Sequence, residues 1–145
     1  RMDNRYQAYR QVDVNTANRG KIVVMLYSGA ITFLNKAKSY MQKNDFVNKG
    51  KFIIKAQNII DELNFSLDMD KGKDVAKNLR SIYIFLNRYL SQANLQCKPE
   101  MIDRAIHILD RLKSAFEEIV NNNEYSEAQE IKKQEQVQHS IRRYV

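Results

Sequence analysis

Residues that break helices are scarce in this sequence, which has one proline and four glycines among 145 residues. Many short strands joined by tight turns need a richer supply of both, so long uninterrupted helices are favoured over an all-β fold. A chain of 145 residues with 43% hydrophobic side chains is long enough for one domain with a real core and too short for two comfortable ones. We therefore expect a single all-α domain.

Cysteine and long apolar runs are nearly absent. Cys97 has no second cysteine to pair with, which excludes a disulfide-stapled secreted scaffold and makes the cytosol the expected compartment. The longest stretch without a charged side chain runs only from residue 22 to residue 35, whereas a membrane-spanning helix needs about 20 apolar residues. The opening residues RMDNRYQAYR lack the apolar region of a signal peptide. We expect neither membrane insertion nor Sec export.

Patterns typical of catalysis or metal binding are also missing. The sequence contains no Glu-x-x-His pair, no Gly-rich phosphate loop and no nucleophile elbow. Asp103 and His107 have the spacing of a two-ligand pair, but a hydrogen bond on a helix surface explains it more simply. Cys97, beside Lys98, lacks the His and acid partners of a catalytic thiol. We expect no enzymatic activity, no catalytic residue, no cofactor and no metal.

Positive charge is in excess, with a formal net charge of +7. Lysines gather around one helix-to-helix junction, where Asp45 alone opposes them: Lys36, Lys38, Lys43, Lys49, Lys51 and Lys55. Such a cluster could attract an acidic partner or a phosphate backbone. Few aromatic or arginine side chains are interleaved to stack on bases, which favours a solvated lysine face over a nucleic-acid site.

Apolar side chains cover an unusually wide part of the stretch from Val14 to Met41. At helical spacing they form two adjacent seams: Val23, Leu26, Ala30, Phe33, Ala37 and Tyr40, and beside them Val24, Tyr27, Ile31, Leu34 and Met41. One seam can serve the protein's own core. The other indicates either a deeper core or a groove for a polypeptide partner, and the pattern leaves both alternatives open.

The helical periodicity predicts four helices. The first, which carries the wide apolar stretch, should begin near residues 15–18, capped by Thr16 or Asn18, and run to about Asn44. The expected apolar seams of the next three helices are Ile53, Ala56, Ile60, Leu63 and Leu67; then Val75, Leu79, Ile82, Leu86, Tyr89 and Ala93, widened by Tyr83 and Leu90; and finally Ile102, Ala105, Leu109, Leu112, Phe116 and Ile119. We expect the second helix to end near Met69, a turn at residues 70–72, and Pro99 at the first position of the fourth helix.

Short connections make neighbouring helices alternate in direction, so the predicted fold is an antiparallel up-down four-helix bundle. We assign residues 18–121 to the bundle and residues 1–17 to a short N-terminal helical cap. The cap carries Tyr6 and Tyr9, and it is either a lid over the core or a plug over a groove. Residues 122–145, with few apolar side chains, are expected to be a C-terminal tail that is partly helical or disordered.

A set of short motifs, spread in order from residue 6 to about residue 120, resembles one family. The motifs are Tyr6-x-x-Tyr9, Val14-x-Thr16-Ala17, Met25-Leu26-Tyr27-x-Gly29-Ala30-Ile31-x-Phe33-Leu34, Leu67-Asp68-Met69-Asp70-x-Gly72, Ala76-x-Asn78-Leu79 and Tyr83. Together they resemble the flagellar export chaperone FliS family. The resemblance implies a bacterial cytosolic chaperone that binds the disordered C-terminal segment of flagellin in a hydrophobic groove, prevents premature polymerisation and aids export by the flagellar secretion system.

The resemblance also implies which residues contact the client, with other flagellar export or regulatory proteins as further partners. The expected client-binding residues are Tyr6, Tyr9, Val14, Val24, Met25, Tyr27, Ile31, Leu34 and Tyr83. Tyr27, Val24 and Ile31 are expected to face the client and not the innermost core. The alternatives from other classes are a basic bundle that binds nucleic acid and a homodimeric structural bundle.

The sequence departs from the family pattern at a few positions. The family usually reads Ala-Ser-Pro with a Glu two residues later, which gives a capped helix start, whereas this chain has Asn18, Arg19 and Lys21. Ser28 replaces the acid after Met-Leu-Tyr, and Lys73 replaces the usual second glycine after Gly72. We therefore expect a poorly capped entry to the first helix.

Overall fold

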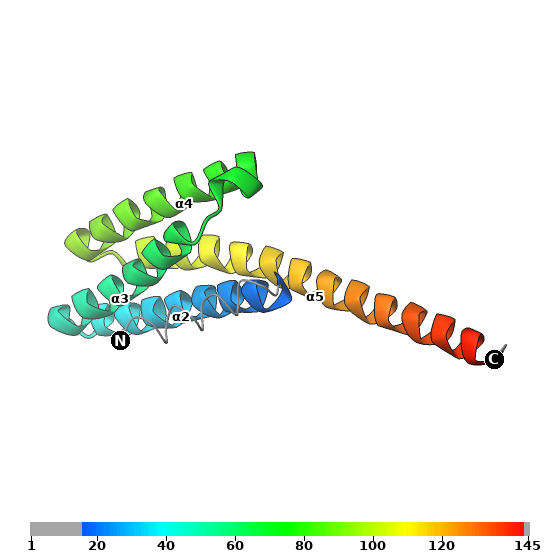
Figure 1. The fold of residues 1–145 in the computed structure, drawn as a ribbon. Coiled ribbons are helices and arrows are strands. Elements are labelled where there is room, and N and C mark those ends of the chain that lie inside the picture. Colours follow the sequence, from blue (N-terminus) through cyan, green and yellow to red (C-terminus); the bar gives the residue numbers. More distant parts are fainter. Residues whose placement is uncertain (1–15, 144–145) are drawn as a thin grey trace, which may run out of the picture. The chain divides into compact units, whose positions relative to one another are not determined.

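The computed structural model describes residues 16–143, with side chains from residue 19 onward, and within this range the chain forms helices joined by short connections (Figure 1). The helices are α2 (Thr16–Gln42), α3 (Phe46–Phe65), α4 (Met69–Gln96) and α5 (Pro99–Arg143). They pack against each other, which confirms the predicted all-α four-helix fold. Helix α2 begins at Thr16, which is inside the predicted window. Asn18 is a helical residue of α2 and is therefore not its N-cap.

The chain divides into two units. One contains residues 23–114, which include parts of all four helices and form the bundle; the other contains residues 1–22 and 115–145. The predicted division into residues 1–17, 18–121 and 122–145 remains a prediction, and most of the predicted cap lies outside the described residues.

Helix α2 faces the core of the bundle along the line between its two predicted seams, so both seams contribute buried side chains. The buried side chains of the core are Tyr27, Ala30, Leu34, Ala37 and Met41 from α2, Ile53, Ala56, Ile60 and Leu63 from α3, Ala76, Tyr83, Leu86, Leu90 and Ala93 from α4, and Met101, Ile102, Ala105 and Leu109 from α5. The first four positions of the predicted α3 seam and the first half of the α5 seam agree with the structure, whereas Leu67 lies beyond the end of α3 and is only half-buried. On the side of α2 toward α3, Phe33 and Tyr40 lie 5.9 and 5.5 Å from the ring of Phe52.

The connection between α3 and α4 differs from the prediction. Helix α3 ends at Phe65 and not near Met69. The side chain of Asp68 caps α4, accepting from the backbone N–H groups of Asp70 and Lys71 at 3.1 and 3.0 Å. An aspartate that satisfies the free amides of a first turn starts a helix, so residues 70–72 lie in the first helical turn of α4 and not in a turn between the helices.

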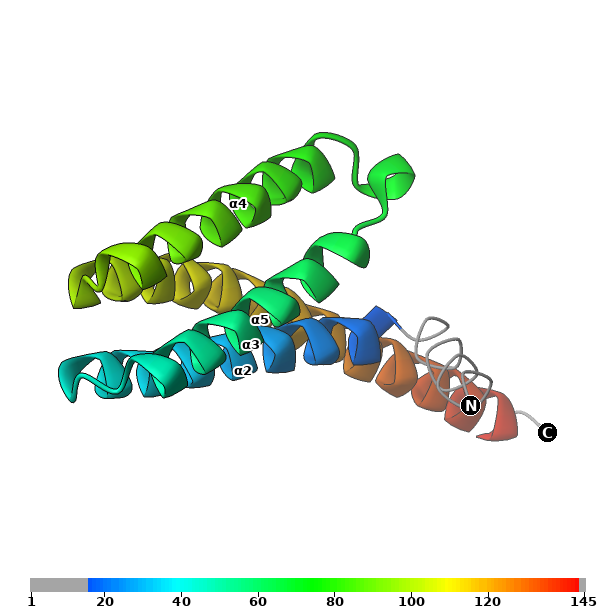
Figure 2. The ribbon, with the colours of Figure 1, turned by 90° about the vertical axis from the view of Figure 1, so that its left-hand side faces the viewer.

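Helix α4 is interrupted at Lys73, whose φ of 45° and ψ of −120° are not helical. Figure 2 shows the result, a single turn of helix separated from the rest of α4 by a thin connection. The interruption resets the helical phase, so Ala76 enters the core whereas Val75, predicted in the seam, is 67% exposed. These backbone angles suit glycine, because a Cβ is crowded there.

We expect Lys73→Gly to raise the free energy of unfolding by about 1 kcal/mol, since the lysine pays a strain cost that glycine avoids. Urea unfolding followed by circular dichroism measures the change. Lys77→Gly, in the regular part of the same helix, is the matched control and should lower stability by about 1 kcal/mol. A loss of stability in both variants would contradict the strain at Lys73.

The unit that contains residues 1–22 and 115–145 joins the start of α2 to the second half of α5. Gly20 lies so close to α5 that an added Cβ would be 2.5 Å from Cγ2 of Val120. Lys21 Nζ forms an ion pair with Glu124 Oε1 at 2.7 Å; the hydrogen bond to Glu124, and then the negative charge of Glu124, raise the pKa of Lys21. Lys21, unfavourable in the first turns of a helix, is thus paired with an acid from α5.

We expect Gly20→Ala to destabilise the protein by about 1–2 kcal/mol, even though alanine has the higher helix propensity, because the short branched side chain of Val120 cannot swing away. Gly50→Ala is the control: its Cβ would lie 3.7 Å from the side-chain amide of Asn94, an ordinary contact. That variant should gain up to about 1 kcal/mol from helix propensity. Equal gains in thermal denaturation of the two variants would refute the close approach at Gly20.

Helix α5 continues through residue 122 without a break as far as Arg143, and its side chains from residue 121 onward are exposed. Within residues 16–143, no helix is both long and apolar enough to cross a membrane.

Candidate functional site

Two tyrosines predicted to bind a partner meet in the core of the bundle. Tyr27 from α2 and Tyr83 from α4 are joined by a hydrogen bond between their hydroxyl groups, and their tilted rings have centroids 6.5 Å apart. Burial, reinforced by Tyr83, raises the pKa of the Tyr27 hydroxyl, and burial also raises the pKa of Tyr83. The pair satisfies two polar groups in a place that water does not reach.

The expectation that Tyr27 faces away from the innermost core is therefore wrong. Tyr27 and Leu34 have no exposed surface, and Tyr83 is buried as well. The reason is the rotation of α2 about its axis. The line between its two apolar seams faces the core, so each seam has some buried side chains and some half-exposed ones. These residues support the bundle from inside.

The outer side of α2 retains the other predicted residues. Val24 and Ile31 are half-buried, and Met25 is 70% exposed. A half-exposed apolar strip of this kind can accept a partner without any rearrangement of the core. The predicted contacts Tyr6, Tyr9 and Val14 lie outside the described residues.

Sequence reasoning missed a shallow trough between α3 and α4, which pack side by side. One hollow, of about 540 Å³, is lined by Gln57, Asn58, Asp61, Asn87, Arg88, Ser91 and Gln92. A second, of about 600 Å³, is lined by Phe46, Lys49, Ser91, Asn94, Leu95 and Cys97. Ser91 lines both hollows, so they form one trough, which we call the α3–α4 trough.

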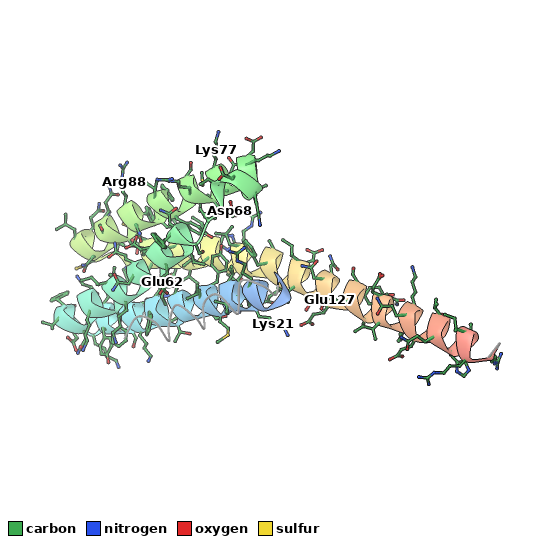
Figure 3. All side chains as sticks on the ribbon, in the orientation of Figure 1. Lys21, Glu62, Asp68, Lys77, Arg88 and Glu127 are labelled. Carbon is green, nitrogen blue, oxygen red and sulfur yellow. The ribbon has the colours of Figure 1, made fainter. Side chains whose placement is uncertain are left out.

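Polar side chains hold the floor of the α3–α4 trough in place. Gln57 Nε2 donates to the carbonyl oxygen of Asn87 and to Ser91 Oγ, each at 2.9 Å. Asn87 Nδ2 donates to Asp61 Oδ1, which leaves Asn87 Oδ1 as a buried acceptor with no partner among the described residues. Arg88, labelled in Figure 3, projects outward from α4 at the same level. The trough thus has both donors and acceptors for a polypeptide backbone.

Exposed apolar side chains on α3 and α4 accompany this polar floor. Phe46 and Ile54 on α3 are about half exposed, Ile84 on α4 is 41% exposed, and Leu95 is 86% exposed. Exposed apolar side chains beside a polar groove are typical of a polypeptide-binding surface. The available signal in the sequence was that these four residues fall outside the predicted core seams.

Comparison with known proteins identifies the family. A family model described as flagellar protein FliS matches residues 2–123. The chain belongs to the FliS family. The flagellar secretion chaperone FliS of Vibrio cholerae is 40% identical over 117 residues, which cover 78% of this chain and 86% of that protein. The FliS of Bacillus subtilis is 31% identical over 121 residues, covering 83% of this chain and 90% of that protein.

A solved structure shares the FliS fold. The crystal structure of a flagellar chaperone from bacteria matches with a TM-score of 0.69 at 20% identity, covering 84% of this chain and 99% of that chain. The FliS family consists of non-enzymatic chaperones, which confirms the expectation that this chain is not an enzyme. Within residues 16–143, no cluster of three or more His, Cys, Asp or Glu side chains could hold a metal.

The lysine cluster of this FliS protein is largely engaged in contacts within the chain. Lys36 and Lys55 lie over aromatic rings, at 5.5 and 4.9 Å from the centroid of Phe52. Lys38 Nζ pairs with Asp103 Oδ1 at 2.9 Å, so Asp103 is committed to an ion pair and not to a metal site with His107. Lys36, Lys43 and Lys51 are nevertheless exposed, so part of the cluster remains a basic surface.

Proposed function

We propose that this FliS protein is a cytoplasmic chaperone that binds the disordered C-terminal segment of flagellin, prevents its premature polymerisation and aids its export. The family assignment sets the class of protein, and the flagellin client is what the family resemblance implies. The observation that carries the proposal is the α3–α4 trough, where a hydrogen-bonding floor is accompanied by exposed apolar side chains.

The chemistry of the trough suits an extended or helical client. Asn58, Arg88 and Gln92 line the trough and are exposed, so their amide and guanidinium groups can pair with a client backbone. Apolar side chains of the client would bury Ile84 and Leu95, which are exposed in the free protein. A client that is disordered before binding loses conformational entropy when it binds, and a long contact surface offsets this loss. Because the two terms nearly balance, the complex can still dissociate.

The half-exposed strip of Val24, Met25 and Ile31 on α2 is the second proposed contact. A client long enough to reach both α2 and the α3–α4 trough would wrap around the bundle. Tyr6, Tyr9 and Val14 complete the proposed client-binding set from the sequence.

Calorimetric titration with a synthetic peptide of the flagellin C-terminal segment tests the proposal. We expect saturable binding of one peptide per chain, with a heterodimer in light scattering and modest sensitivity to salt. Titration with generic double-stranded DNA is the control. The absence of peptide binding, or steeply salt-dependent DNA binding in its place, would overturn the proposal.

A further inference from the structure

The side chain of Lys49 is buried at the start of α3, with 5% of its surface exposed. Its Nζ donates to the carbonyl oxygen of Asn94 at 2.8 Å and to Cys97 Sγ at 3.2 Å, and it lies 5.3 Å from the ring centroid of Phe46. No carboxylate among the described residues forms an ion pair with Lys49. The ammonium group is therefore held against a sulfur atom and not against an acid.

Cys97 is held equally firmly at the end of α4. It is the C-cap residue in the left-handed conformation, with φ of 54° and ψ of 44°, and its N–H donates to the carbonyl oxygen of Ala93 at 3.0 Å. Its thiol lies 3.6 Å from the carbonyl oxygen of Asn94. Cys97 is only half-buried and lines the hollow beside Leu95, so a small solute can reach the sulfur.

We propose that Lys49 and Cys97 form a covalent nitrogen–oxygen–sulfur bridge when a peroxide oxidises the protein. One hydrogen peroxide oxidises the Cys97 thiol to a sulfenic acid, forming an S–O bond and releasing one water. The neutral Lys49 amine, its extra proton given to solvent, then loses one N–H hydrogen, and the sulfenic acid loses its O–H hydrogen. An N–O bond forms as a second peroxide takes up those two hydrogens and two electrons and is reduced to two waters.

The position of the Lys49 amine explains why oxidation of Cys97 would give a bridge. A sulfenic acid is usually resolved by a second thiol, but this chain has a single cysteine. The Lys49 nitrogen already contacts the sulfur, so the sulfenic oxygen forms within reach of it and the second peroxide can join the two by oxidation. The proposal concerns the redox chemistry of the chain and does not rest on flagellin binding.

The bridge would join the start of α3 to the end of α4 at one end of the α3–α4 trough. A cross-link between residues 49 and 97 closes a long loop, which restricts the unfolded chain and should raise the thermal midpoint by several degrees. Because Phe46 and Leu95 line the same hollow, the bridge would also hold the walls of the trough in a fixed position.

Mass spectrometry of the full-length protein after hydrogen peroxide treatment tests the proposal. We expect an intact mass increased by one oxygen and decreased by two hydrogens, full reversal by dithiothreitol, and a protease fragment in which the Lys49 and Cys97 peptides are linked. Lys49→Arg keeps the positive charge but offers no primary amine, so it should show whole-oxygen additions at Cys97 only. Lys51→Arg, on the exposed side of α3, is the matched control and should still form the bridge.

If circular dichroism shows that Lys49→Arg does not fold, the mass spectra of the oxidised wild-type protein alone test the proposal. Whole-oxygen additions at Cys97 without the linked Lys49–Cys97 fragment would overturn the proposal. The same mass change in correctly folded Lys49→Arg would overturn it as well.

Discussion

Replacing Tyr27 by alanine should lower the free energy of unfolding by about 3–5 kcal/mol, the usual cost of emptying a buried aromatic site. Tyr27 has no exposed surface, and its ring packs against Tyr83 across the bundle. Removing it leaves a cavity and strands the Tyr83 hydroxyl without its partner. Urea unfolding monitored by circular dichroism measures the loss.

Phenylalanine variants separate the packing of these rings from their hydrogen bond. Tyr27→Phe keeps the ring but leaves the Tyr83 hydroxyl unsatisfied, so we expect a loss of about 1–3 kcal/mol. The double replacement of Tyr27 and Tyr83 by phenylalanine removes both hydroxyls and should cost less than the sum of the two single variants. Strict additivity would show that the two hydroxyls do not interact.

The tyrosine pair should also make the fold sensitive to alkali. The raised pKa values of Tyr27 and Tyr83 mean that the folded state favours the protonated hydroxyls. Their contribution is fully present below about pH 10, the pKa of an unfolded tyrosine, and is lost as the pH rises further. The double phenylalanine variant should lose less stability than the wild type as the pH rises above about 10 in the same unfolding measurement. Parallel pH profiles would contradict this assignment.

Charged replacements of exposed apolar residues at and beside the α3–α4 trough should weaken client binding. We expect Ile84→Asp and Leu95→Glu each to weaken the affinity for the flagellin peptide by about tenfold or more, and the double variant by about a hundredfold, because a buried apolar contact becomes an unpaired charge. Both side chains are exposed in the free protein, so folding should change by less than about 0.5 kcal/mol. Calorimetric titration gives the affinities.

Val137→Asp is the matched control for these trough variants. Val137 is also an exposed apolar residue, but it lies on the C-terminal part of α5. Its replacement should leave the affinity unchanged. Equal weakening by all three replacements would point to a general charge effect, and unchanged affinity in the trough variants would remove the trough from the client-binding surface.

Local signals in the sequence were enough for the helices and their order. Ile53, Ala56, Ile60 and Leu63 recur at helical spacing and are buried as predicted, because a seam in the middle of a regular helix has only one way to face a core. Pro99 begins α5 as predicted, since its missing N–H costs nothing at a first helical position. The family motifs, spread along the bundle, supplied the chaperone assignment.

The apolar pattern of the sequence did not determine how each helix is rotated about its own axis. The wide stripe of α2 fits several rotations equally well, so Tyr27 was predicted at the surface and lies in the core. In α4, one non-helical residue at Lys73 shifted the phase and exchanged Val75 for Ala76 in the core. Such choices depend on which neighbouring helix is present at each face.

The sequence by itself determined a helical bundle, its approximate helix boundaries and its place in the FliS family, because periodicity, caps and motifs are properties of short segments. Only the tertiary structure decided what surrounds Tyr27, which side chains form the α3–α4 trough and that Lys49 touches Cys97. Residues 49 and 97 are far apart along the chain, and no local pattern encodes their distance. That distance follows from the packing of α3 on α4, which depends on all the core side chains at once.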